Sequence, residues 1–115
     1  MRRAILLIFI SIFILSGTSA YAHPPSNIKV EHSSESRMLT IIVTHPVKNV
    51  EKHFIKKIDI GLNGKEILSH KIKKQDNNEY QFAVYMIPDA KIVDRITVEA
   101  YCSISGKLKK EIDVK

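Results

Sequence analysis

Cysteine is almost absent from this sequence, which has 115 residues and a single cysteine, Cys102. A lone cysteine cannot form a disulfide within its own chain, so a disulfide-stapled scaffold is excluded. Cys102 is left as a core side chain, one half of an intermolecular bridge, a reactive thiol or a metal ligand. The chain also lacks internal repeats, low-complexity linkers and any segment with a sustained helical period, which argues against repeat and all-helical architectures.

The N-terminal 22 residues have the pattern of a secretory signal peptide. A pair of arginines supplies a positive start, residues 4–15 form an apolar run, and residues 20–22 place small side chains at both recognition positions. We predict cleavage after Ala22, with a cut after Ala20 as the alternative, and export to the periplasm or the extracellular space. The apolar run is shorter than the roughly 20 residues that span a bilayer, so we expect no stable membrane anchor after cleavage.

Removal of this segment leaves residues 23–115, a length that fits one small domain with a single modest core. The formal net charge then falls from +6 to +4, because the arginine pair leaves with the segment. The remaining lysines are scattered among acidic residues, and no aromatic-rich basic motif accompanies them. This balance favours a solvated surface, and we expect no nucleic-acid partner.

The remaining chain has the apolar pattern of β-strands: residues 38–43 form a β-branched run, and several later segments alternate apolar with polar residues. The expected strand segments are 38–43, 58–62, 67–72, 80–86, 96–104 and 108–114. Asn63-Gly64 and Ser105-Gly106 offer tight turns between neighbouring segments. Several short strands at this spacing predict an all-β fold, an immunoglobulin-like antiparallel β-sandwich of about seven strands.

Three histidines and the cysteine occur in a suggestive order: His23, His45, His53 and Cys102. The predicted cleavage makes His23 the N-terminal residue, His45 and His53 border an inter-strand loop, and Cys102 precedes a strand turn. Taken singly, His45 reads as a solvated loop residue, His53 as a strand-edge residue and Cys102 as a core side chain. Taken together, imidazoles and a thiolate are ligands that iron, copper and zinc prefer, so the sequence predicts a metal site.

Residues 44–60, 99–106 and 23–25 carry a resemblance to a known family. The first stretch is similar to the H-P-M-x-x-x-H-Y-I-x-W-I-E-L segment of the desulfoferrodoxin and superoxide reductase iron domain, the second to its E-Y-C-N-x-H-G, and the third to its H-V-P. The resemblance covers essentially the whole mature chain and implies a seven-stranded immunoglobulin-like sandwich. It also implies an Fe²⁺ ion held by the three histidines and Cys102, superoxide reduction, and a small electron-donor protein as partner.

The sequence departs from that family's pattern in its ligands and its charge. The family's last histidine falls on Ser105, and the loop from His45 to His53 is two residues longer. The lysine that precedes the first histidine in active reductases is also missing from the mature chain. A free N-terminal His23 could replace the lost ligand by binding through both its α-amine and its Nδ1 atom.

Three kinds of function follow from these matches and departures. The first is a superoxide reductase-like enzyme. The second is a non-catalytic periplasmic protein that binds copper or iron, because two histidines, a cysteine and a weak further ligand also describe an electron-transfer copper site. The third is an interaction module, a sandwich whose metal site has decayed.

Overall fold

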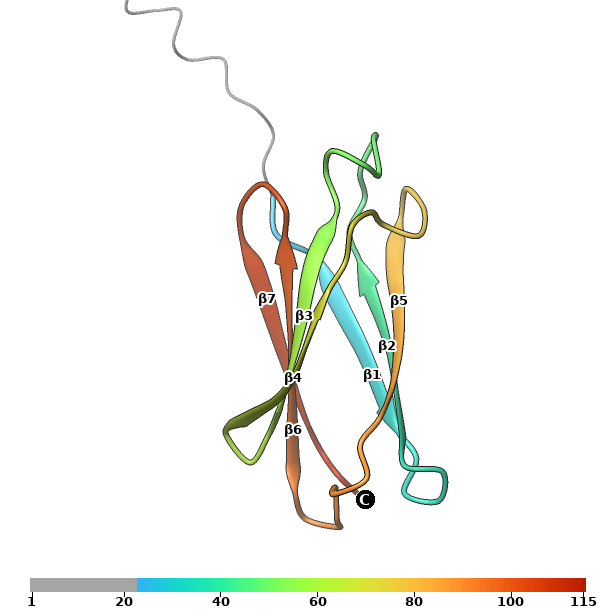
Figure 1. Ribbon diagram of the computed structural model, residues 1–115, viewed down its shortest axis with the longest axis vertical. Coiled ribbons are helices and arrows are strands. Elements are labelled where there is room, and N and C mark those ends of the chain that lie inside the picture. The colour runs from blue at the N-terminus through green and yellow to red at the C-terminus, as the bar shows by residue number, and fades with distance from the viewer. Residues whose placement is uncertain (1–22) are drawn as a thin grey trace, which may run out of the picture.

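The computed structural model describes residues 23–115, which form seven strands in two antiparallel sheets (Figure 1). The strands are β1 (Asn27–His32), β2 (Met38–Thr44), β3 (Ile55–Leu62), β4 (Lys65–Lys71), β5 (Tyr80–Met86), β6 (Arg95–Cys102) and β7 (Lys107–Asp113). One sheet has the strand order β1-β2-β5 and the other the order β4-β3-β6-β7. The predicted antiparallel β-sandwich of about seven strands is confirmed, whereas the proposed signal peptide, residues 1–22, lies outside the described residues.

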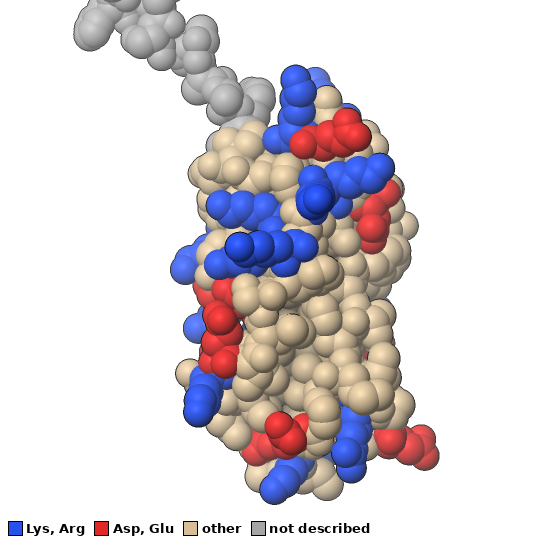
Figure 2. Space-filling view, in the orientation of Figure 1, with Lys and Arg blue, Asp and Glu red and all other residues tan. Residues whose placement is uncertain are grey.

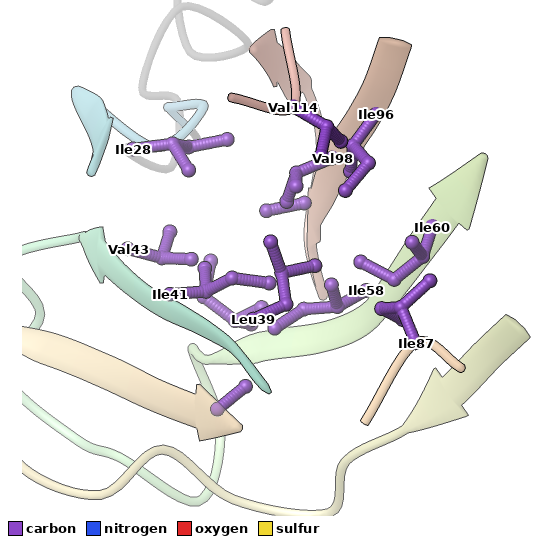
Figure 3. Close-up of a cluster of buried hydrophobic side chains, with 13 residues drawn as sticks. Ile28, Leu39, Ile41, Val43, Ile58, Ile60, Ile87, Ile96, Val98 and Val114 are labelled. Carbon is purple, nitrogen blue, oxygen red and sulfur yellow. The ribbon is translucent and has the colours of Figure 1, made fainter. Parts of the chain in front are cut away.

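The core lies between the two sheets, because alternate residues of the central strands point inward (Figure 3). Removing a Val, Leu or Ile side chain from water stabilises the fold by about 1.5–3 kcal/mol, so these rows drive the association of the sheets. The buried apolar cluster consists of Ile28, Leu39, Ile41, Val43, Ile55, Ile58, Ile60, Ala83, Ile87, Ile96, Val98, Ala100 and Val114.

A β-bulge adjusts β3 to this core. Ile55 and Ile58 are both buried although they are three residues apart, a spacing that would put them on opposite faces of a regular strand. The register with β6 shifts between Ile55 and Lys57, so one extra residue is accommodated there. The bulge directly follows the segment that carries His53, and it therefore helps to set where that segment joins the sheet.

The edges of the larger sheet are charged. Its outermost strands, β4 and β7, are largely exposed and rich in lysine and glutamate. Figure 2 shows acidic side chains interspersed with basic ones on this view of the molecule. Charged edge strands oppose pairing with the strands of other molecules.

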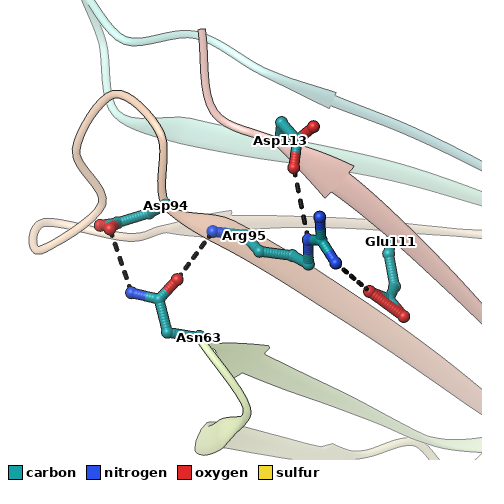
Figure 4. A network of polar contacts seen from close by, with 5 residues as sticks. All are labelled: Asn63, Asp94, Arg95, Glu111 and Asp113. Atoms are coloured by element: carbon teal, nitrogen blue, oxygen red, sulfur yellow. Dashed lines mark hydrogen bonds and ion pairs between the residues drawn. The ribbon is translucent and has the colours of Figure 1, made fainter.

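Polar contacts fasten the end of the sandwich that holds the β3–β4 hairpin (Figure 4). Asn63 Nδ2 donates to Asp94 Oδ1 at 3.0 Å, and the Arg95 backbone N–H donates to Asn63 Oδ1 at 2.9 Å. The Arg95 guanidinium also lies 3.4 Å from Asp113 and 3.5 Å from Glu111 on β7. The two ion pairs are exposed and contribute little, whereas the Asn63 amide adds a side-chain link to the backbone pairing that joins β3 to the start of β6.

The β6–β7 turn differs from the sequence prediction. We expected Ile104 on the same face as Ala100 and Cys102, but β6 ends at Cys102 and Ile104 is 47% exposed. The cause is that the Cys102 N–H donates to the Gly106 carbonyl at 2.9 Å, which closes the turn before the alternation can continue. Within residues 23–115 no helix is present that could cross a membrane.

Candidate metal site

Segments that are far apart in the sequence meet at the end of the sandwich opposite the β3–β4 hairpin (Figure 1). These are the segment before β1, the β2–β3 loop, the β4–β5 loop and the β6–β7 turn. The ring centroids of His23 and His45 are 4.9 Å apart, and His53 lies 4.8 Å from each of them. One nitrogen from each ring lies within 4.8 Å of the others. A single metal ion could therefore be held by these three imidazoles.

His45 directly follows β2 and is fully buried, not solvated as a typical loop histidine would be. Its backbone N–H donates to the Glu79 carbonyl at 2.8 Å, which ties it to the β4–β5 loop. Its Nδ1 atom lies 2.8 Å from Gln75 Oε1, and that oxygen also accepts the Ile55 N–H at 3.2 Å. Gln75 Nε2 donates to the carbonyls of His45 at 2.7 Å and Asn77 at 2.9 Å.

These contacts determine which nitrogen of His45 carries the proton. The Gln75 oxygen accepts a backbone N–H and the Gln75 nitrogen faces two carbonyls, so the hydrogen bonds assign the orientation of the amide. The Gln75 contact at 2.8 Å is shorter than the 3.4 Å between His45 Nε2 and the His23 carbonyl oxygen, so it assigns the N–H of the neutral ring to Nδ1 and the lone pair to Nε2. Desolvation by burial lowers the pKa of His45 below its usual 6.5, which favours the neutral ring that a metal needs.

His53 is positioned by a turn centred on Asn49. The Asn49 side-chain oxygen accepts the N–H groups of Glu51 at 2.9 Å and Lys52 at 3.3 Å, and the Asn49 carbonyl accepts the His53 N–H at 2.9 Å. The Nε2 atom of His53 is buried and has no hydrogen-bond partner among residues 23–115. Both ring nitrogens of His32 are likewise buried and unpartnered, but only His53 lies beside two other imidazoles, where a bound ion would supply the partner.

The pKa of His53 is also lowered from its usual 6.5. Desolvation by burial is the main cause, and the proximity of His45 and His23 adds to it. His53 therefore stays neutral at a pH where an exposed histidine would begin to take up a proton. A neutral imidazole with a free nitrogen is the form that binds a metal ion.

His23 completes the cluster from the N-terminal side. Its Nδ1 atom lies 3.1 Å from the Pro24 carbonyl oxygen, which can only accept. Nδ1 is thus the N–H of the ring in this arrangement, and Nε2 is the free nitrogen. A chelate through the α-amine and Nδ1, as the sequence suggested, would have to give up this contact with Pro24.

Cys102 lies outside the histidine cluster. It is the last residue of β6, is only 2% exposed, and its Sγ atom is 3.4 Å from the backbone nitrogen of Ile104. The adjacent Ser103 ties this end of β6 to the His53 segment, because its N–H donates to the Phe54 carbonyl at 2.8 Å and its hydroxyl accepts the Phe54 N–H at 3.0 Å. The fold thus anchors the segment that carries Cys102 beside the segment that carries His53, but it groups only the imidazoles.

The surface beside the cluster is hollowed. A hollow of about 620 Å³ is bordered by His23 and His53 together with Pro46, Val47, Lys48, Asn49 and Asn78. Lys48 is the one basic side chain in this lining. Ser105 is exposed in the β6–β7 turn, so no fourth imidazole is provided from that position. A small molecule could therefore approach two of the three rings from solvent.

No protein-family model matches this sequence, and no curated protein matches it either. Among solved structures, the chain is similar to the superoxide reductase (1Fe-SOR) from Giardia intestinalis. The identity is 17%, the match covers 80% of this chain and 100% of that chain, and the TM-score is 0.62. It is also similar to a hypothetical protein from Pyrococcus horikoshii OT3, with 15% identity, 85% and 94% coverage and a TM-score of 0.57.

At these identities the comparisons establish the fold alone. The chain has a superoxide reductase-like β-sandwich fold, and at one end it carries three histidines that could hold a metal ion.

Proposed function

We propose that this protein binds one redox-active metal ion through His23, His45 and His53. Cys102, which lies outside this cluster, is proposed as a further ligand on the family resemblance alone. The observation that carries the proposal is the buried, unpartnered Nε2 atom of His53 beside two other imidazoles. Nitrogen and sulfur ligands suit iron and copper, and no carboxylate belongs to the cluster, which disfavours calcium and magnesium.

The residues present fit ferrous iron. Burial favours the neutral form of His45 and Gln75 orients its ring, whereas its Nε2 atom lies 3.4 Å from the His23 carbonyl oxygen and would exchange that contact for the metal. Cys102 would bind as a thiolate, the form in which cysteine is a metal ligand. When bound there, ferrous iron would supply the one electron that, with two protons, converts superoxide to hydrogen peroxide.

The chain's own contribution to such a reaction is binding, orientation and access. The hollow beside His23 and His53 admits a small molecule, and Lys48 gives its lining a positive charge that favours an anion. Ser105 stands where the family has a further histidine, and this missing imidazole leads us to propose superoxide reduction below that of a complete site. We further propose that the protein is exported and takes its electrons from a small donor protein.

A non-catalytic copper-binding protein is the second candidate. The observation in its favour is Ser105, which is exposed in the turn where the family has its fourth histidine. Three imidazoles and a thiolate bind copper more tightly than iron by the Irving–Williams order. A protein that only binds copper would not need to leave room at the metal for superoxide.

The test is metal reconstitution of the exported protein, with its N-terminus determined by mass spectrometry. We expect one Fe²⁺ or copper ion per chain under anaerobic conditions, and loss of binding in His45→Ala and His53→Ala. His70→Ala is the matched control, because His70 is an exposed histidine outside the cluster. Superoxide consumption by the iron-loaded protein, measured by stopped-flow spectroscopy, separates the two candidates. Failure of the wild-type protein to retain either ion would contradict the proposal.

A further inference from the structure

The β6–β7 turn lies against the N-terminal segment at Gly106. A Cβ atom built on Gly106 would lie 2.9 Å from Pro24 Cβ, 3.0 Å from Pro24 Cα and 3.1 Å from Pro24 N. Separations under 3.0 Å are essentially never seen for real Cβ atoms, and two of these three neighbours are backbone atoms that cannot swing aside. The turn and Pro24 can therefore touch only because residue 106 has no side chain.

We propose that Gly106 is a positioning residue for the metal site. Because it has no side chain, the β6–β7 turn can pack against Pro24, and Pro24 then holds His23 beside His45 and His53. This proposal rests on the proposed function, in which His23 is a metal ligand. His23 stands four residues before the start of β1 at Asn27, so the sheet does not hold it directly. Its place depends instead on what Pro24 and Pro25 touch and on the long contact of 3.4 Å between its own carbonyl oxygen and His45 Nε2.

Displacement of Pro24 would be passed on to His23. The proline rings fix φ at both Pro24 and Pro25, so this stretch has little freedom to absorb a shift. The contact between His23 Nδ1 and the Pro24 carbonyl at 3.1 Å also couples the ring to that residue. A shift of Pro24 at the β6–β7 turn is therefore expected to move the His23 imidazole as well.

The required shift is large on the scale of metal coordination. Ordinary van der Waals contact begins at 3.4 Å, so a side chain at Gly106 would push the Pro24 Cβ away by about half an ångström. Metal–ligand distances tolerate only about 0.2 Å. Gly106→Ala should therefore weaken metal binding by about tenfold or more, as is typical when groups that orient a ligand are lost.

Gly64 offers a matched control. Gly64 has φ +85° and Gly106 has φ +92°, so alanine is strained in the same left-handed region at both positions. Nothing lies within 4 Å of a Cβ built on Gly64, which is at the opposite end of the sandwich. A difference between the two alanine variants in metal affinity thus reports the Pro24 contact and not the backbone strain.

The experiment measures Zn²⁺ affinity by competition with a chromophoric chelator in wild type, Gly106→Ala, Gly64→Ala, His23→Ala and the double variant His23→Ala with Gly106→Ala. We expect Gly106→Ala to lose affinity about tenfold, Gly64→Ala to match wild type, and the double variant to bind as His23→Ala does. Wild-type affinity in Gly106→Ala, or a further loss in the double variant, would overturn the proposal.

Two additional measurements keep the proposal separate from folding and from the proposed function. If Gly106→Ala does not fold, Pro24→Gly is the second variant, because it removes the proline ring without straining the turn. Pro24→Gly should weaken Zn²⁺ binding about as much as expected for Gly106→Ala. Unchanged binding in Pro24→Gly would overturn the proposal. If the wild type binds neither Zn²⁺ nor Fe²⁺ nor copper, the proposed function fails, and NMR of the metal-free protein decides the positioning. The positioning role of Gly106 is supported if the nuclear Overhauser contact between the His23 and His53 rings is lost in Gly106→Ala but not in Gly64→Ala. Retention of this contact in both variants refutes it.

Discussion

Replacing Gln75 with methionine would remove the amide that orients His45 while keeping the length of the side chain. Gln75 is fully buried, and its side chain forms hydrogen bonds to the His45 ring at 2.8 Å, the Ile55 N–H at 3.2 Å, the His45 carbonyl at 2.7 Å and the Asn77 carbonyl at 2.9 Å. In Gln75→Met two interior N–H groups, those of His45 Nδ1 and Ile55, would lose their acceptor. The substitution therefore perturbs both the fold and the metal site.

The size of each effect follows from these contacts. A buried donor that loses its acceptor costs about 1–3 kcal/mol, so two of them predict a loss of about 2–6 kcal/mol in the free energy of unfolding. This is a substantial part of the about 5–15 kcal/mol that stabilises a typical domain. The His45 ring would also be free to rotate and to exchange tautomers, which should lower metal affinity by about 10–100-fold.

Gln81→Met separates the two effects. Gln81 is also buried, and its side chain contacts the Asp76 N–H at 3.0 Å, the Asp76 carboxylate at 3.2 Å and the Phe82 carbonyl at 2.8 Å, but no histidine. Chemical denaturation should show lower stability in both variants, while chelator competition should show weaker Zn²⁺ binding in Gln75→Met alone. Two-bond ¹H–¹⁵N spectra of the metal-free protein report the His45 tautomer directly. Wild-type affinity together with a retained Nδ1–H in Gln75→Met would refute the reasoning.

The other predictions concern the remaining ligands and pH. Cys102→Ser should abolish the thiolate-to-metal charge-transfer band of the iron- or copper-loaded protein while its circular dichroism stays unchanged, and a retained band would exclude Cys102 as ligand. Ser105→His should tighten Fe²⁺ binding and raise the rate of superoxide reduction in stopped-flow assays, and no change would show that this exposed turn cannot supply a fourth imidazole. The metal-free protein should lose stability as the pH falls below 6.5, because the folded-state pKa values of His45 and His53 are lowered and the unfolded chain takes up protons first. Denaturation midpoints between about pH 7.5 and about pH 5.5 test this, and a double variant of these histidines to glutamine should flatten the dependence.

The alternation of apolar residues predicted the strands whose buried faces are well marked. β2 and β6 each bury every second residue. This period is plain in the sequence of β6, whereas β2 was predicted from its β-branched run. β1 was not located in this way, because only Ile28 of its six residues is buried. The extension of the β6 alternation to Ile104 was wrong, since a backbone hydrogen bond, which leaves no trace in hydrophobicity, closes the turn there.

The histidine cluster was predicted as a set of residue types, but its environment was not. His45 looks like a solvated loop residue because Pro46 and polar residues follow it. Its burial comes from the pairing of two loops, in which the His45 N–H donates to Glu79 and the Val47 N–H to Asn78, both at 2.8 Å. Long-range pairing of this kind has no local signal in the sequence.

Gln75 and Gly106 show the same limit for residues that do not bind the metal themselves. Gln75 lies in the polar stretch 73–78, where the sequence indicates only a loop, and its four hydrogen bonds reach residues 2 to 30 positions away. Gly106 is recognisable as a turn residue, but its contact with Pro24 spans almost the whole described chain. Side chains that orient a ligand thus depend on the tertiary fold even where the ligand itself follows from a motif.

The placement of the histidines links metal binding to the closure of the sandwich. His23 and His45 adjoin strands of the smaller sheet, while His53 leads into β3 of the larger one. An ion shared by these rings would therefore connect the two sheets at the end where the hydrophobic core gives way to loops. Because such an ion binds the folded chain and not the dispersed ligands of the unfolded one, its binding free energy adds directly to the stability of the sandwich. The metal-free protein loses stability at low pH because histidines of the site are buried in neutral form. Metal binding by the same histidines would offset that loss.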